Sequence, residues 1–132
     1  MLHIFEKKDT SKEKPPYLER IDELTHVDIV RLKGNIDLEM VPIIDSRIQE
    51  NRRKGGHIEK NIILDFAKVQ HIDTATLAFH IIRIREYQKE GKKICFINVS
   101  PAMETLFNIF HQENFFKIFK TEPEAIKELD RP

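Results

Sequence analysis

The chain has 132 residues, of which 40% are hydrophobic and 33% are charged, and this length suits one domain with a single modest core. Lysine plus arginine number 22, as do aspartate plus glutamate, so no overall charge bias favours nucleic acid or an anionic membrane as a partner. Its single cysteine, Cys95, lies in an apolar run, which excludes a disulfide framework and favours a buried thiol in a reducing cytoplasm.

The first residues indicate a polar tail rather than a targeting segment. The apolar stretch before Glu6 is too short for a signal peptide, and no window approaches the roughly 18 apolar residues of a membrane span. The segment from Glu6 to Pro16 is rich in lysine and ends in two prolines, a composition typical of a linker. We therefore divide the chain into a tail or linker, residues 1–16, and a folded domain, residues 17–132.

The first half of this domain reads as a hairpin, a helix and a buried strand. Residues 17–24 and 27–33 have the β-branched and apolar content of two strands around a polar break. A helix from about residue 41 to 53 follows, with Val41, Ile44 and Ile48 on one face. The compact apolar run 61–66 then suits a central strand covered on both sides, and residues 67–72 read as a short polar loop.

The second half alternates helices and strands. Residues 74–90 place Leu77, Ile81 and Ile84, with Ala78 and Ile82, on one helical face. A buried strand at 93–99 precedes a third helix, in which Ser100 is the N-cap and Met103, Leu106, Phe107 and Phe110 form the apolar stripe. A short strand at 115–119 is followed by a capping box that starts at Thr121 and by a helix that runs through Leu129.

This order predicts an α/β fold. Strands that alternate with helical crossovers pair in parallel, whereas the initial hairpin is antiparallel. We expect one mixed, mostly parallel sheet of four to five strands with about four helices.

The most informative stretch is 65–78, in which a buried strand and a polar loop lead to Asp73-Thr74-Ala75-Thr76-Leu77 at a helix start. It resembles the STAS domain, whose hallmark is a hydrophobic strand, a loop, and an Asp-Ser-Ser-Gly-Leu or Asp-Thr-x-x-Leu/Ala turn that opens a helix. Gly34-Asn35-Ile36-Asp37 resembles the Gly-x-aliphatic-Asp turn of that family. The resemblance covers about residues 17–129 and implies a STAS-like fold.

The resemblance also implies a function. STAS members that antagonise anti-sigma factors bind a serine/threonine kinase-type anti-sigma factor, and phosphorylation at the helix start releases the partner. Here the second serine of the family motif corresponds to Ala75, which has no hydroxyl. Thr74 is therefore the first candidate for phosphorylation and Thr76 the second. The implied partner-binding residues are Asp37, Asp73, Thr74, Ala75, Thr76 and Leu77.

Simpler roles remain open for these side chains. Asp73 and Asp37 can each act as a helix N-cap, and Thr74 can be a solvated hydroxyl of the first turn. His80, Arg83 and Tyr87 either line the partner surface or belong to a solvated helix face, and the solvated face is the default. Phe115 or Phe116 would be exposed only as exceptions to core packing.

Several functional classes find no support in the sequence. The six histidines, at positions 3, 26, 57, 71, 80 and 111, are scattered without the spacing of metal ligands. Four glycines cannot supply a phosphate-cradling loop or a dinucleotide fingerprint. No activated nucleophile is recognisable, and Asp65 and Asp73 are expected at opposite ends of one loop. We expect no cofactor, metal or catalysis.

Two other binding roles are alternatives that the resemblance leaves open. One is a constitutive accessory subunit of a membrane transporter for lipids or anions, in which the same turn docks on a cytoplasmic face. The other is a stressosome-type scaffold subunit, for which the tail would be a linker. The sequence leaves the oligomeric state, including a homo-oligomer, open.

Overall fold

The computed structural model describes residues 18–55, 60–110 and 117–132. In these ranges the chain forms a five-stranded sheet with strand order β1-β2-β3-β4-β5. β1 is antiparallel to β2, and the other neighbouring strands are parallel. The strands are β1 (Leu18–Glu23), β2 (Val27–Ile36), β3 (Asn61–Ile72), β4 (Ile94–Ile97) and β5 (Lys117–Phe119).

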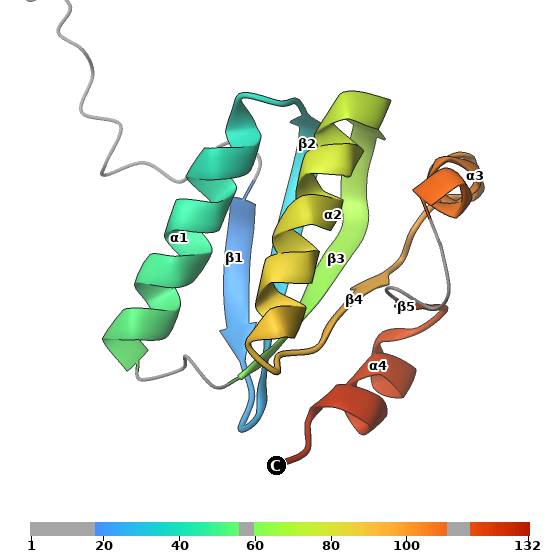
Figure 1. Ribbon diagram of the computed structural model, residues 1–132. Coiled ribbons are helices and arrows are strands. Elements are labelled where there is room, and N and C mark those ends of the chain that lie inside the picture. Colours follow the sequence, from blue (N-terminus) through green and yellow to red (C-terminus); the bar gives the residue numbers. More distant parts are fainter. Residues whose placement is uncertain (1–17, 56–59, 111–116) are drawn as a thin grey trace, which may run out of the picture.

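Helices cover both faces of the sheet. They are α1 (Met40–Gly55), α2 (Thr74–Lys89), α3 (Pro101–Phe110) and α4 (Glu122–Leu129). α1 and α2 lie side by side in front of the sheet (Figure 1), and α3 adds Met103 and Phe107 to the same core. α4 packs on the opposite face. The mixed, mostly parallel sheet with four helices confirms the predicted fold class.

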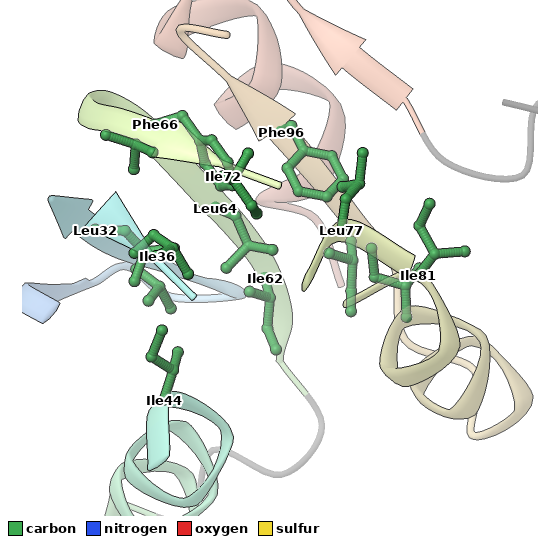
Figure 2. Packing of buried hydrophobic residues seen from close by; sticks show 14 of the residues in the cluster. Leu32, Ile36, Ile44, Ile62, Leu64, Phe66, Ile72, Leu77, Ile81 and Phe96 are labelled. Atoms are coloured by element: carbon green, nitrogen blue, oxygen red, sulfur yellow. The ribbon is translucent and has the colours of Figure 1, made fainter. Parts of the chain in front are cut away.

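The larger core lies between the sheet and the first three helices. The apolar spacing of α1 and α2 produces it, because Ile44 and Ile48 from α1 and Leu77, Ile81 and Ile84 from α2 are all buried. Figure 2 shows labelled side chains of this cluster: Leu32, Ile36, Ile44, Ile62, Leu64, Phe66, Ile72, Leu77, Ile81 and Phe96.

The second core is smaller and depends on α4. Alternate residues of β2, β3 and β4, among them Ile29, Ile63 and Cys95, point to this face and meet Ala125 and Leu129. Burial raises the pKa of the Cys95 thiol to about 12, so the group stays protonated, as expected for a buried cysteine. β3 and β4 therefore have both faces covered, which explains their continuous apolar runs.

The predicted helix starts have the expected caps. The backbone N–H of Met103 donates to Ser100 Oγ at 3.2 Å, and the N–H of Glu124 donates to Thr121 Oγ1 at 3.3 Å. These two bonds satisfy donors that have no partner inside a helix. Both caps were predicted from residue type alone.

β3 is longer than the sequence predicts. It continues past Phe66 through the expected loop to Ile72, and its register with β2 shifts twice, between the pairs Arg31–Asp65 and Lys33–Lys68 and again between Gly34–Val69 and Asn35–His71. At each shift β3 has one residue more than β2, which is a β-bulge. The bulges break the strict alternation of the side chains and leave residues 67, 68, 70 and 71 exposed.

β2 includes Gly34 and ends at Ile36, so the predicted end at Lys33 was too early. Asp65 is a buried residue within β3 and does not bound a loop with Asp73. The tail 1–16, Tyr17, Phe115 and Phe116 lie outside the described residues.

Candidate functional site

Two turns meet at the carboxyl ends of β2 and β3. Because these strands are parallel, both chains leave the sheet at the same edge and enter α1 and α2. Ile36, the last residue of β2, is registered with Ile72, the last residue of β3. Asp37 directly follows β2, and Asp73 directly follows β3. The structure therefore brings together the two turns that the sequence singled out. This edge is where ligands of open α/β sheets commonly bind.

Asp73 is the N-cap of α2. Its backbone is extended, and Oδ1 accepts a hydrogen bond from the Thr76 backbone N–H at 2.8 Å. The polar side chain and the backbone N–H of Thr76 hold the pKa of the Asp73 carboxyl below its usual value. The carboxylate therefore stays ionised next to the positive end of the helix dipole.

The four residues after Asp73 divide between surface and core. Thr74 and Ala75 are exposed, whereas Thr76 and Leu77 have no accessible surface. The division follows the helical repeat, because α2 must turn one side toward the sheet. Within the turn that opens α2, Thr74 is the exposed hydroxyl, and the buried side chains of Thr76 and Leu77 offer no contact surface to a partner.

Asp37 caps the neighbouring helix. Its side-chain Oδ1 and its backbone carbonyl both accept from the Met40 N–H, at 3.2 Å and 3.1 Å. The residue is exposed, and so is Leu38, with 41% of its surface accessible. Asp37 thus has the capping role that the sequence left open, on the same edge of the sheet as Thr74.

The expectation of a solvated face was wrong for His80 and Tyr87, which are buried. Both point into the contact between α1 and α2, where Tyr87 Oη donates to Asp45 Oδ1 at 3.2 Å and Arg83 pairs with the same carboxylate. A cavity of about 30 Å³ lies here, lined by His80, by the Asp45, Arg83 and Tyr87 side chains and by aliphatic residues. Burial lowers the pKa of His80 to about 4, against the opposing effect of the Asp45 charge.

The outer surface of α2 carries apolar side chains that were not predicted as exposed. Phe79 and Ile82 have 47% and 52% of their surface accessible. Ile82 was assigned to the core face, which is a correction, and Phe79 was not assigned. With Ala75 they are spaced at i, i+4 and i+7, so they form a stripe that begins next to Thr74. The helical spacing of these residues places them on a different face from Leu77, Ile81 and Ile84. That difference could have indicated their exposure from the sequence.

The helices of the described ranges include none with the length and apolar character that a membrane crossing requires.

Comparison with known proteins agrees with this geometry. A putative anti-sigma factor antagonist from Thermotoga maritima matches with a TM-score of 0.72 and 17% identity, covering 85% of this chain and 94% of that one. The anti-sigma factor antagonist SpoIIAA in its unphosphorylated form matches with a TM-score of 0.60 and 23% identity, covering 83% and 94%. Phosphorylated SpoIIAA from Bacillus matches with a TM-score of 0.61 and 23% identity, covering 83% of this chain and 96% of that one.

These structures share the fold of this chain at low identity. The family model for the STAS domain matches residues 20–125, a range that contains both aspartate turns, β2 to β5 and most of β1. The chain belongs to the STAS domain family.

Proposed function

We propose that this chain is a phospho-regulated protein-binding module that acts in the cytoplasm. Unmodified, it binds a serine/threonine kinase-type anti-sigma factor through the edge that carries Asp37 and Asp73. Phosphorylation of Thr74 by that partner releases it. The role is one of binding, with no reaction catalysed by the chain itself.

The observation that carries the proposal is the exposure of Thr74 in the first turn of α2. A kinase can reach this hydroxyl without unfolding the domain. Burial of Thr76 and the missing hydroxyl of Ala75 remove the competing acceptors at this turn. Thr74 is therefore the acceptor that we assign.

Charge explains how one phosphate can act as a switch. The amino-terminal end of a helix tolerates an anion, because free backbone N–H groups and the helix dipole face it. The roughly 1.5 to 2 negative charges of a phosphate would repel a closely docked partner and raise its desolvation cost. Asp37 and Asp73 lie at the same edge and add to this repulsion. The domain stays folded while the interface is lost.

The similar structures support a fold that tolerates this modification. SpoIIAA is known in unphosphorylated and phosphorylated forms, and the present chain matches the two with TM-scores of 0.60 and 0.61. Both forms therefore share the fold of this chain to the same extent, which supports a fold that accommodates a phosphate.

A binding assay with three forms of the chain tests the proposal. The kinase-type partner is captured with wild type, Thr74→Glu and Thr25→Glu. Thr25 is also exposed, but it lies in the β1–β2 turn at the opposite end of the sheet. We expect Thr74→Glu to bind at least about tenfold more weakly, a difference of about 1.4 kcal/mol, and Thr25→Glu to bind like wild type.

Incubation of the complex with ATP, followed by peptide mass mapping, should place one phosphate on Thr74. A stable complex in which Thr74 stays unmodified, and which Thr74→Glu also forms, would rule out the switch. Capture of a membrane transporter subunit by both wild type and Thr74→Glu would instead identify a constitutive accessory role.

A further inference from the structure

A groove of about 350 Å³ lies between the end of β3 and α3. One wall consists of residues 70–72 of β3, and the other includes Met103, Leu106 and Ile109 of α3. In Figure 1, α3 is set to the side of the upper end of β3. The volume falls within the range of sites that hold small molecules or short peptide segments.

β3 presents a strand edge to this groove. β4 pairs only with residues 62–65 of β3, whereas β2 pairs with β3 up to Ile72. Within the described ranges, residues 66–72 therefore have no neighbouring strand on the side of β4. About half of the backbone N–H and C=O groups of a strand point to each side. The Ala67 N–H is already taken by Asp65 Oδ1 at 2.9 Å, whereas further along this side no strand of the described ranges pairs with β3.

The described residues that line the groove include no Asp, Glu, Lys or Arg, although these four types make up 33% of the chain. Ile109 has 64% of its surface accessible, the largest value among the exposed large hydrophobic residues described. Burial of such a side chain favours binding, because apolar surface leaves water. An occupant with charged side chains would lose hydration here without finding an opposite charge.

We propose that this groove binds an extended, uncharged, apolar segment of a partner protein, which lies along the free edge of β3. Its backbone pairs with β3 beyond Asp65, and its alternate side chains contact Met103, Leu106 and Ile109. Strand addition beside a helix is the mode by which PDZ and PTB domains bind peptides. The free strand edge gives hydrogen bonds, and α3 gives the apolar contacts.

The groove adjoins the proposed switch. Ile72 lines the groove and directly precedes Asp73, so one partner can occupy the groove and cover Thr74. The inference concerns the same partner as the proposed function and rests on it for that identity, but peptide binding to the groove can be measured without that partner.

A phage-displayed library of random octapeptides provides the first test. It is selected on the wild-type chain after depletion on Ile109→Lys, in which a charge enters the apolar wall. We expect the enriched peptides to alternate apolar residues with uncharged polar residues. Bound peptide should slow hydrogen exchange at the backbone amides of residues 68–72. Failure to enrich any peptide, or enriched peptides that leave these amides unprotected, would overturn the proposal.

Affinities of the selected peptide and of the kinase-type partner provide the second test. Ile109→Lys is compared with Asn108→Lys, which adds the same charge to the adjacent exposed position of α3 outside the groove. We expect Ile109→Lys to weaken both ligands at least about tenfold and Asn108→Lys to leave both unchanged.

The outcomes separate the two proposals. If Thr74→Glu releases the partner while Ile109→Lys binds both ligands like wild type, the groove proposal fails and the proposed function stands. If Ile109→Lys loses both ligands while Thr74→Glu retains the partner, the groove is a binding site and the phospho-switch fails.

Discussion

Asp73 and Thr74 are adjacent residues with different tasks. Asp73 stabilises the start of α2 by accepting the Thr76 N–H, and Thr74 projects an exposed hydroxyl from the first turn. Asp73 thus contributes to the stability of the fold, whereas Thr74 is available for contact with a partner. Substitutions can therefore separate stability from partner binding at this turn.

Removal of the Asp73 carboxylate should destabilise the domain measurably. We expect Asp73→Ala to lower the free energy of unfolding by about 1 kcal/mol, because a helix donor loses its cap. Asp73→Asn keeps an acceptor oxygen and should stay within about 0.5 kcal/mol of wild type. Urea unfolding monitored by circular dichroism measures both. Equal stability of the alanine and asparagine variants would contradict the capping role.

His80 should make stability depend on pH. Its pKa falls from 6.5 in the unfolded chain to about 4 in the folded domain, so the unfolded chain takes up the proton first as the pH drops. The free energy of unfolding is then largest above about pH 6.5 and falls by about 3 kcal/mol down to about pH 4.

Urea unfolding of wild type and His80→Leu at a series of pH values isolates this effect. Carboxyl groups titrate in both proteins and cancel in the difference between them, whereas the His80 contribution is present in wild type alone. Parallel pH curves for the two proteins would show that His80 does not titrate in this way.

Residue type and order were enough to predict the two aspartate turns, and they failed at His80 and Tyr87. A cap needs only one polar side chain before an apolar repeat, which is a local pattern. Burial of His80 depends instead on α1, whose Asp45 and isoleucines surround it in space but not in sequence. A solvated face was the reasonable expectation for a polar residue without that information.

At the scale of elements, β3 shows that a strand with bulges is difficult to recognise from its sequence pattern. Its first residues form an apolar run that any reading would assign to a strand. After Phe66 the buried residues are Val69 and Ile72, which are spaced by three because each bulge adds a residue. This spacing is not the alternation of a strand, and the residues between are mostly polar, so the sequence favoured a loop.

α2 offers a direct test of which face carries the core. Ile81 is buried, and its neighbour Ile82 is half exposed. We expect Ile81→Ala to lower the free energy of unfolding by about 3 kcal/mol, because a cavity remains in the core. Ile82→Ala should change it by less than about 0.5 kcal/mol. Chemical denaturation measures the free energy of unfolding of both variants. Similar losses for the two would contradict the assignment of Ile81 to the core face of α2.

At the scale of the whole molecule, Arg31 connects elements that are distant in the chain. Its guanidinium donates to Asp22 of β1 at 2.9 Å, to Asp65 of β3 at 2.9 Å and to Glu122 of α4 at 2.6 Å. Burial acts to raise the pKa of Asp65, but hydrogen bonds from Asn98, the Ala67 N–H and Arg31 outweigh it and keep that pKa low. The network thus fastens α4 to the sheet.

Loss of Arg31 should therefore weaken the whole domain. Both partners of the Arg31–Asp65 pair are mostly buried, with 13% and 10% of their side chains accessible, so removal of one leaves a charge without its counterion. We expect Arg31→Met to cost about 3 kcal/mol. Arg20 also pairs with Asp22 but is 52% accessible, and Arg20→Met should cost less than about 1 kcal/mol. Thermal unfolding of the two variants gives the comparison.

The paired bulges of β3 bear on how the chain tolerates a change of length. Without Ala67, the order Phe66, Lys68, Val69 alternates between inside and outside like an ordinary strand, and the same holds around Gln70. Loss of one residue at either place would leave every apolar side chain on its own face, whereas loss of Ile63 would invert the remainder of the strand. Shorter homologues could therefore keep Thr74 in the same position, and an alignment should place its gaps at these two points.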